Sequence, residues 1–198
     1  YVPMITKMLL EEGMPLDLVF MVTAESNFNV SERSHKSAVG LWQFIASTGR
    51  IYGLKINRWI DERRDPVLAT KAAIKYLKHL YGLFDDWELA MAAYNTGEGR
   101  VKRAIKRAKR QGMKHNYSSL RLPREPRGYV PAIMAMAVIY KNPARYGLGH
   151  VRPIQAMDET KASLPVSFSL EEVAQRSKIS FRLLRDKNPA LFLGVPPM

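Results

Sequence analysis

Apolar side chains recur every three or four residues along most of this chain, which is the spacing of one face of an α-helix. The spacing predicts helices at residues 1–12, 16–26, 47–52, 66–81, 87–94, 101–114 and 129–140. Residues 121–131 contain three prolines and are expected to be extended. The pattern therefore predicts a mainly helical fold for the first 150 residues.

Capping residues mark several of these helices. Asp65 precedes Pro66, and Asp86 precedes the helix at 87–94, so both aspartates are expected to be N-caps. Gly82 is expected to end the helix that begins at Pro66. The helix at 87–94 is built from small apolar residues, which permit close packing, and it is therefore predicted to be the central helix.

The chain after residue 150 has a different pattern. Residues 151–166 are expected to form a linker, and two short helices between extended pieces are expected after it. The predicted organisation is a domain at 1–150, a linker at 151–166 and a small appendage at 167–198.

Composition adds a strong charge. The 198 residues are 46% hydrophobic, contain no cysteine and carry a net charge of +13, which predicts an anionic partner. No apolar run approaches the roughly 18 residues that span a membrane, and no signal peptide is visible. Because the chain begins at Tyr1, an upstream segment with a membrane anchor is an open expectation.

Much of the positive charge lies in one helix. Residues 101–114 contain seven lysines or arginines and no acid. With Val101, Ala104, Ile105 and Ala108 facing inward, the bases face outward. This face either meets an anionic polymer or is simply solvated.

Glu25 is the leading candidate for chemistry. It is expected in the last turn of the helix at 16–26, where the carbonyl ends of the helix disfavour a negative charge. That position and the apolar neighbour Phe28 are expected to raise the pKa of Glu25, as a general acid requires. An exposed glutamate at a helix end is the simpler alternative.

Two further polar clusters accompany it. Gln43 lies within the apolar run at 38–45, and its amide needs partners, which sugar hydroxyls or acetamides could supply. Residues 94–100 place two glycines beside polar side chains and predict a loop shaped around a ligand, with an ordinary helix turn as the alternative. No second histidine lies at metal spacing from His35, so no metal and no cofactor are expected.

Four motifs stand in one order along the chain, at residues 25–28 (ESNF), 40–44 (GLWQF), 93–101 (AYNTGEGRV) and 128–131 (GYVP). Together they resemble the catalytic domain of the soluble-type lytic transglycosylases, and most closely the membrane-bound lytic transglycosylase D group. The resemblance covers residues 1–148 and implies a lysozyme-like helical domain with a substrate cleft. Pro126 stands where the family usually has threonine, so the loop before Tyr129 is expected to differ.

The resemblance also implies roles for individual residues. Glu25 would be the catalytic acid and then base, Ser26 would support the glycan or the acid, and Gln43 would line the cleft. Tyr94, Asn95 and Tyr129 would bind the sugar. Peptidoglycan would be the partner of a monomeric enzyme in the bacterial periplasm or cell envelope, anchored or secreted, and no nucleic acid is expected.

The C-terminal residues resemble a degenerate LysM module, a small α/β glycan-binding fold. The segment at 169–174, Ile179-Ser180, Leu184 and Asn188-Pro189 match its pattern. Phe168-Ser169 replaces the usual Gly-Asp, so a packing role is the alternative to glycan binding.

The function expected from these motifs is cleavage of the β-1,4 bond between MurNAc and GlcNAc. Only one carboxylate is convincingly placed, because Asp61, Glu62 and Asp65 lie beside Arg63 and Arg64, where ion pairing is expected. The substrate's own C6 hydroxyl would then act as nucleophile and give 1,6-anhydro-MurNAc ends. The alternatives are a hydrolytic muramidase of goose-lysozyme type and a basic helical nucleic-acid-binding protein.

Overall fold

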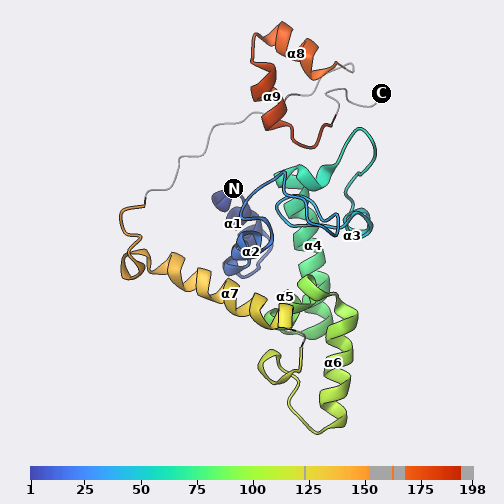
Figure 1. Cartoon of the computed structure of the whole chain (residues 1–198), viewed down its shortest axis with the longest axis vertical. Helices are drawn as coiled ribbons and strands as arrows, with labels where there is room; N and C mark the ends of the chain where they lie inside the picture. The colour runs from blue at the N-terminus through green and yellow to red at the C-terminus, as the bar shows by residue number, and fades with distance from the viewer. Residues whose placement is uncertain (123, 152–161, 163–167, 193–198) are drawn as a thin grey trace. The chain divides into compact units, whose positions relative to one another are not determined.

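The computed structural model describes residues 1–122, 124–151, 162 and 168–192 (Figure 1). Its helices are α1 (Val2–Glu11), η1 (Leu16–Phe20), α2 (Met21–Ser26), α3 (Ala46–Ile51), η2 (Glu62–Arg64), α4 (Pro66–Phe84), α5 (Trp87–Thr96), α6 (Glu98–Arg110), η3 (Tyr117–Ser119), α7 (Arg124–Lys141), η4 (Pro143–Tyr146), α8 (Leu170–Ser177) and α9 (Phe181–Lys187). Within the described ranges, β-structure is limited to isolated bridges. The predicted mainly helical fold is confirmed.

The chain forms two compact units. The first contains Tyr1–Ile5, Glu25–Ala72 and Arg152–Met198, and the second contains Thr6–Ala24 and Ala73–Val151. The predicted linker at 151–166 lies almost wholly outside the described residues, so the boundaries at 150 and 166 stay a prediction. None of the helices that the structure describes is both long and apolar enough to cross a bilayer.

Helix α5 is the centre of the second unit, as its composition predicted. It packs against α6 and α7 (Figure 1). Helix α7 also packs against η1 and η4. The α5 residues Leu89, Ala90, Met91, Ala92 and Ala93 are all buried. Their small side chains allow neighbouring helices to approach closely. The Asp86 carboxylate accepts a hydrogen bond from the Leu89 amide at 3.0 Å and caps the helix as expected.

Several predicted helix boundaries differ from the structure. The helix predicted at 101–114 is α6 at Glu98–Arg110, and the one predicted at 16–26 is η1 followed by α2. Two more differences have a clear cause. Helix α4 runs through Gly82 to Phe84, because one interior glycine costs only about 1 kcal/mol relative to alanine. Helix α7 begins at Arg124, inside the segment expected to be extended. Amides of a first turn have no partner within the helix, so Pro126 removes no helical hydrogen bond there. The chain before Tyr129 is therefore helical and not a loop.

The first unit contains long loops that are held by side chains. The Trp42 indole donates a buried hydrogen bond of 2.9 Å to the Thr70 hydroxyl on α4. The Asp65 carboxylate accepts from the amides of Val67 and Leu68 at 2.9 and 2.8 Å, which confirms it as the cap of α4. Helices α8 and α9 pack against each other, and Ser169 and Glu172 form a capping box at the start of α8. The two short helices predicted in the C-terminal part are thus confirmed.

Candidate active site

Glu25 lies in the last turn of α2, where the sequence predicted it. Its side chain is partly buried. The chain turns directly after the helix through Asn27 and Phe28, whose φ angles of 49° and 61° are left-handed. Asparagine adopts this conformation readily, but in Phe28 it costs of order 1–3 kcal/mol and persists only where the surrounding structure imposes it. The fold therefore fixes the backbone beside Glu25 against its local preference.

Ser26 links this turn to a second segment of the first unit. Its hydroxyl is buried and donates a hydrogen bond of 2.9 Å to the carbonyl of Leu41. We refer to residues 37–44 as the 37–44 loop. Ser26 thus holds the 37–44 loop against the end of α2, next to Glu25.

Gln43 satisfies its amide within the protein. Its Nε2 donates to the carbonyl of Gly40 at 2.9 Å and to that of Glu32 at 3.3 Å. Its own backbone is left-handed, with φ of 47°. The suggestion that sugar groups are the partners of this amide nitrogen is therefore wrong, because its partners are two backbone carbonyls. Gln43 fixes the shape of the 37–44 loop.

A buried ion pair supports the 37–44 loop from the other side. Arg63 and Asp61 are both buried, and Arg63 Nη2 lies 2.7 Å from Asp61 Oδ2. Arg63 Nη1 also donates to the carbonyls of Ser37 and Phe44 at 3.0 and 2.9 Å. The two ends of the 37–44 loop are therefore held by one guanidinium. The predicted ion pairing is confirmed for Asp61, whereas Glu62 and Asp65 accept hydrogen bonds from backbone amides.

Gly40 packs directly on the same turn. Its φ is +84°, and a Cβ built there would lie 1.9 Å from the carbonyl oxygen of Arg63. No side chain fits, since a real Cβ would overlap the Arg63 backbone. Neither this contact nor the Arg63 bonds could be found from local sequence, because they join segments about 20 residues apart. The only local sign was a glycine within an otherwise apolar run.

The second unit carries the predicted sugar-binding residues Tyr94, Asn95 and Tyr129. Tyr94 and Asn95 lie in the last turn of α5, and the Gly97 turn, with φ of 86°, leads directly into α6. The predicted ligand-shaped loop is therefore a short helix–helix turn. Tyr94 lies beside Tyr76, with ring centroids 5.1 Å apart, and Tyr129 is buried in α7.

Asn95 carries an unusual buried atom. Its Oδ1 is buried and has no hydrogen-bond partner. A buried amide oxygen without a partner costs roughly 1–3 kcal/mol. A hydroxyl or amide donor on a bound ligand would satisfy this oxygen, and sugar binding by Asn95 stays a prediction.

Other acids near the motifs have structural partners. Glu98 pairs with Lys102 at 2.8 Å and with His79 at 3.2 Å. The hydrogen bond from Lys102, with a smaller one from His79, lowers the pKa of Glu98 despite partial burial. Glu62 accepts from the Lys55 amide at 2.7 Å, and Glu32 accepts from the Asn29 side chain at 3.0 Å. These bonds give Glu98, Glu62 and Glu32 structural partners within the protein.

The two units divide the predicted site residues between them. The first carries Glu25, Ser26 and Gln43, and the Ser26 hydroxyl bonds the loop that contains Gln43. The second carries Tyr94, Asn95 and Tyr129. His35 is exposed, and the described side chains contain no group of three or more metal-ligating residues placed to hold an ion.

Known proteins match this chain along most of its length. A model of the transglycosylase SLT domain matches residues 3–117. The membrane-bound lytic murein transglycosylase D of Escherichia coli is 42% identical over 183 residues, which are 90% of this chain and 40% of that protein. The chain thus spans less than half the length of this relative.

Two solved structures resemble the fold. The 70 kDa soluble lytic transglycosylase of Escherichia coli matches with a TM-score of 0.58 and 22% identity, over 75% of this chain and 24% of that one. An inactive mutant of the lytic transglycosylase Slt from Pseudomonas aeruginosa matches with a TM-score of 0.54 and 22% identity, over 72% of this chain and 24% of that one. At this identity the likeness shows the fold alone, and it agrees with the predicted lysozyme-like helical domain.

Proposed function

Because this chain belongs to the transglycosylase SLT family, we propose that it cleaves the MurNAc–GlcNAc bond of peptidoglycan without adding water. The observation that carries the proposal is the position of Glu25 in the last turn of α2, directly before a left-handed turn and beside Ser26, which is bonded to the 37–44 loop. Asp61, Glu62, Asp65 and Glu98 have structural partners, which supports Glu25 as the single catalytic carboxylate.

A single carboxylate favours a nucleophile from the substrate. In the proposed reaction, Glu25 protonates the oxygen of the leaving sugar as the glycosidic bond breaks. The resulting carboxylate takes the proton of the C6 hydroxyl, whose oxygen bonds to C1 and closes the 1,6-anhydro ring. The 2-acetamido group of the same sugar stabilises the positive charge that develops at C1. Asn95 and Tyr129 are proposed to hold the sugar, and the buried Asn95 Oδ1 offers an acceptor for it.

The product distinguishes this reaction from hydrolysis. We expect fragments of purified sacculi that end in 1,6-anhydro-muramic acid and are about 18 Da lighter than hydrolysed fragments, since no water is added. Mass spectrometry of the released fragments measures this difference directly. Fragments with free reducing ends as the main product would instead identify a hydrolytic muramidase.

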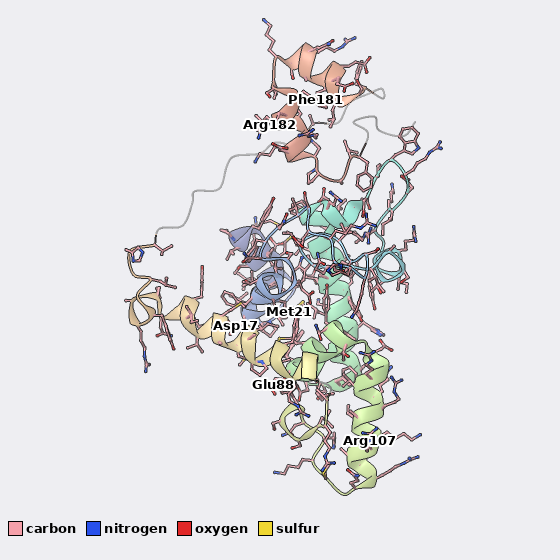
Figure 2. The ribbon with its side chains drawn as sticks, in the orientation of Figure 1. Asp17, Met21, Glu88, Arg107, Phe181 and Arg182 are labelled. Atoms are coloured by element: carbon pink, nitrogen blue, oxygen red, sulfur yellow. The ribbon has the colours of Figure 1, made fainter. Side chains whose placement is uncertain are left out.

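The outer face of α6 is proposed to contact the carboxylates of the glycan's peptides. Figure 2 shows side chains projecting outward from this helix, with Arg107 labelled. A groove of about 540 Å³ lies between α6 and the end of α4. Its lining combines apolar and basic residues: Leu83, Phe84, Ile105, Lys102, Lys106, Lys109 and Arg110. None of its described lining residues is acidic. Lys102 is paired with Glu98, so Lys106, Lys109 and Arg110 supply the positive charge that an anion would meet there.

Charge reversal tests this contact. We expect the triple change Lys106→Glu, Lys109→Glu and Arg110→Glu to weaken sacculus binding several-fold and to make it less dependent on salt. The reason is that exposed charges act over about 8–10 Å near physiological ionic strength. Pull-down with sacculi at several salt concentrations measures both effects.

The matched control replaces three exposed lysines elsewhere, Lys55, Lys71 and Lys75, with glutamate. This gives the same change in net charge. If both triple variants lose affinity equally, only net charge matters and the groove has no specific role.

We also propose that residues 167–198 form a LysM-like appendage after a linker at 151–166. The packed helix pair α8 and α9 supports this. In the described part of this segment, Leu191 also forms an isolated β-bridge with Ile60. We further propose a monomeric enzyme of the periplasm or cell envelope. Its attachment to a membrane, through a segment upstream of Tyr1, is proposed because the relative is described as membrane-bound.

A further inference from the structure

The segment that follows α9 pairs with a loop near the candidate site. In the first unit, the Asp61 amide donates to the carbonyl of Ala190 at 2.8 Å, and the Phe192 amide donates to the carbonyl of Trp59 at 3.0 Å. Ile60 and Leu191 form an antiparallel bridge between these two bonds. The guanidinium of Arg64 also lies over the Phe192 ring, 5.0 Å from its centroid. Residues 190–192 thus pair with the edge formed by residues 59–61 through one isolated antiparallel bridge.

This edge belongs to a narrow turn at residues 56–61 that is hydrogen-bonded within itself. Two groups of Asn57 form the hydrogen bonds of this turn. Its backbone amide donates to the Ile60 carbonyl at 2.8 Å, and its side-chain oxygen accepts from the amides of Trp59 and Ile60. The outward-facing amide of Asp61 and carbonyl of Trp59 are the two groups that residues 190–192 satisfy. An unpaired edge of this kind leaves such groups to solvent.

Asp61 connects this pairing to the candidate site. Its amide is held by Ala190, while its carboxylate accepts from Arg63 Nε at 2.8 Å and Nη2 at 2.7 Å. The same guanidinium holds both ends of the 37–44 loop, at the carbonyls of Ser37 and Phe44. The 37–44 loop in turn accepts the Ser26 hydroxyl next to Glu25. Every link in this chain of contacts is a hydrogen bond within one compact unit.

We propose that residues 190–192 are a positioning segment for the catalytic acid, acting through Asp61, Arg63 and the 37–44 loop. The segment itself touches no reacting atom. It fixes the backbone of Asp61, and Asp61 fixes the guanidinium that sets the distance between the two ends of the 37–44 loop. The catalytic part of this inference rests on the proposed function, whereas the link from the segment to the loop does not.

Phe192→Pro tests the link, because proline has no amide hydrogen to donate to Trp59. The first readout is hydrogen exchange at the amides of Val39, Gly40 and Gln43, which are hydrogen-bonded within the first unit. We expect these amides to exchange about tenfold faster or more, as in a local opening. The amides of α5 serve as an internal reference and are expected to keep their wild-type rates.

The second readout is the kinetics of sacculus cleavage. We expect kcat to fall about tenfold to a hundredfold, since small displacements of a catalytic group have effects of this size. KM is expected to stay within about twofold, because the segment contacts no substrate. Phe192→Leu is the matched control: it keeps the amide and removes only the aromatic ring, so exchange and kcat should both stay near wild type.

Three results would overturn the inference. One is unchanged exchange in the 37–44 loop of Phe192→Pro, which would show that the segment is not coupled to the loop. Another is faster exchange throughout the chain, including α5, which would make the segment a general stabiliser. The last is a rise in KM with unchanged kcat, which would indicate substrate binding. If the wild-type protein cleaves no peptidoglycan, the proposed function fails, while the exchange data still decide whether the segment controls the loop.

Discussion

Replacing Glu25 with glutamine should remove nearly all sacculus cleavage while the protein stays folded. Glutamine has the size of glutamate but cannot deliver a proton, a step that usually contributes about 10²–10⁴-fold to the rate. In the proposed reaction the same carboxylate acts twice, first as acid and then as base, so the loss should reach at least the upper part of that range. Release of soluble fragments from labelled sacculi measures the rate.

Glu11→Gln is the matched control for this experiment. Glu11 is exposed at the end of α1 and pairs with Lys7 at 3.9 Å, an ion pair that contributes little. The control should keep wild-type activity, and both variants should unfold at the temperature of the wild type. Near-normal turnover by Glu25→Gln would end the assignment of Glu25 as the catalytic acid, and with it the single-carboxylate mechanism.

The largest loss of stability is expected from Asp61→Ala. This change leaves the Arg63 guanidinium buried without its carboxylate, and breaking a buried pair in this way typically costs about 3–5 kcal/mol. For a chain of this size that corresponds to a fall in Tm of roughly 6–20 °C. Thermal unfolding followed by circular dichroism gives the value. Activity should fall as well, since the same pair holds both ends of the 37–44 loop.

The same substitution at Asp186 is the control. Asp186 is 59% exposed in its side chain and lies 4.0 Å from both Arg182 and Arg185. Exposed pairs contribute about 0–1 kcal/mol, so the Tm of Asp186→Ala should stay within about 4 °C of the wild type. Equal losses in the two variants would show that the buried pair adds no particular stability.

Local chemistry in the sequence was enough for most of the helices and for the identity of the candidate acid. Asp65 and Asp86 were recognised as caps because a capping side chain bonds amides only two or three residues away. The central role of α5 followed from its small apolar residues, which are buried in the structure. Glu25 was placed in the last turn of a helix by the apolar run at 16–22, by Pro15 and Asp17 at its start and by Asn27 and Asn29 at its end. These features depend on neighbours within about one turn, so a single sequence contains them.

The failures also have a physical pattern. Glycine and proline were given too much weight as helix breakers at Gly82 and at the start of α7. Packing of a long apolar face outweighs the roughly 1 kcal/mol cost of one glycine, and a proline in a first turn removes no helical bond. Local propensity was overruled wherever tertiary contacts were stronger.

Only the tertiary structure decided how the 37–44 loop is held. Gln43 was recognised as an amide in need of partners, but its partners are the carbonyls of Gly40 and Glu32. The role of Arg63 at both ends of the loop, and the pairing of residues 190–192 with residues 59–61, were not visible in the sequence. Backbone carbonyls are present at every position, so a sequence cannot say which of them a distant donor will reach. That choice is made by the packing of the whole unit, which brings Asp61 and Ala190 within hydrogen-bonding distance across about 130 residues of chain.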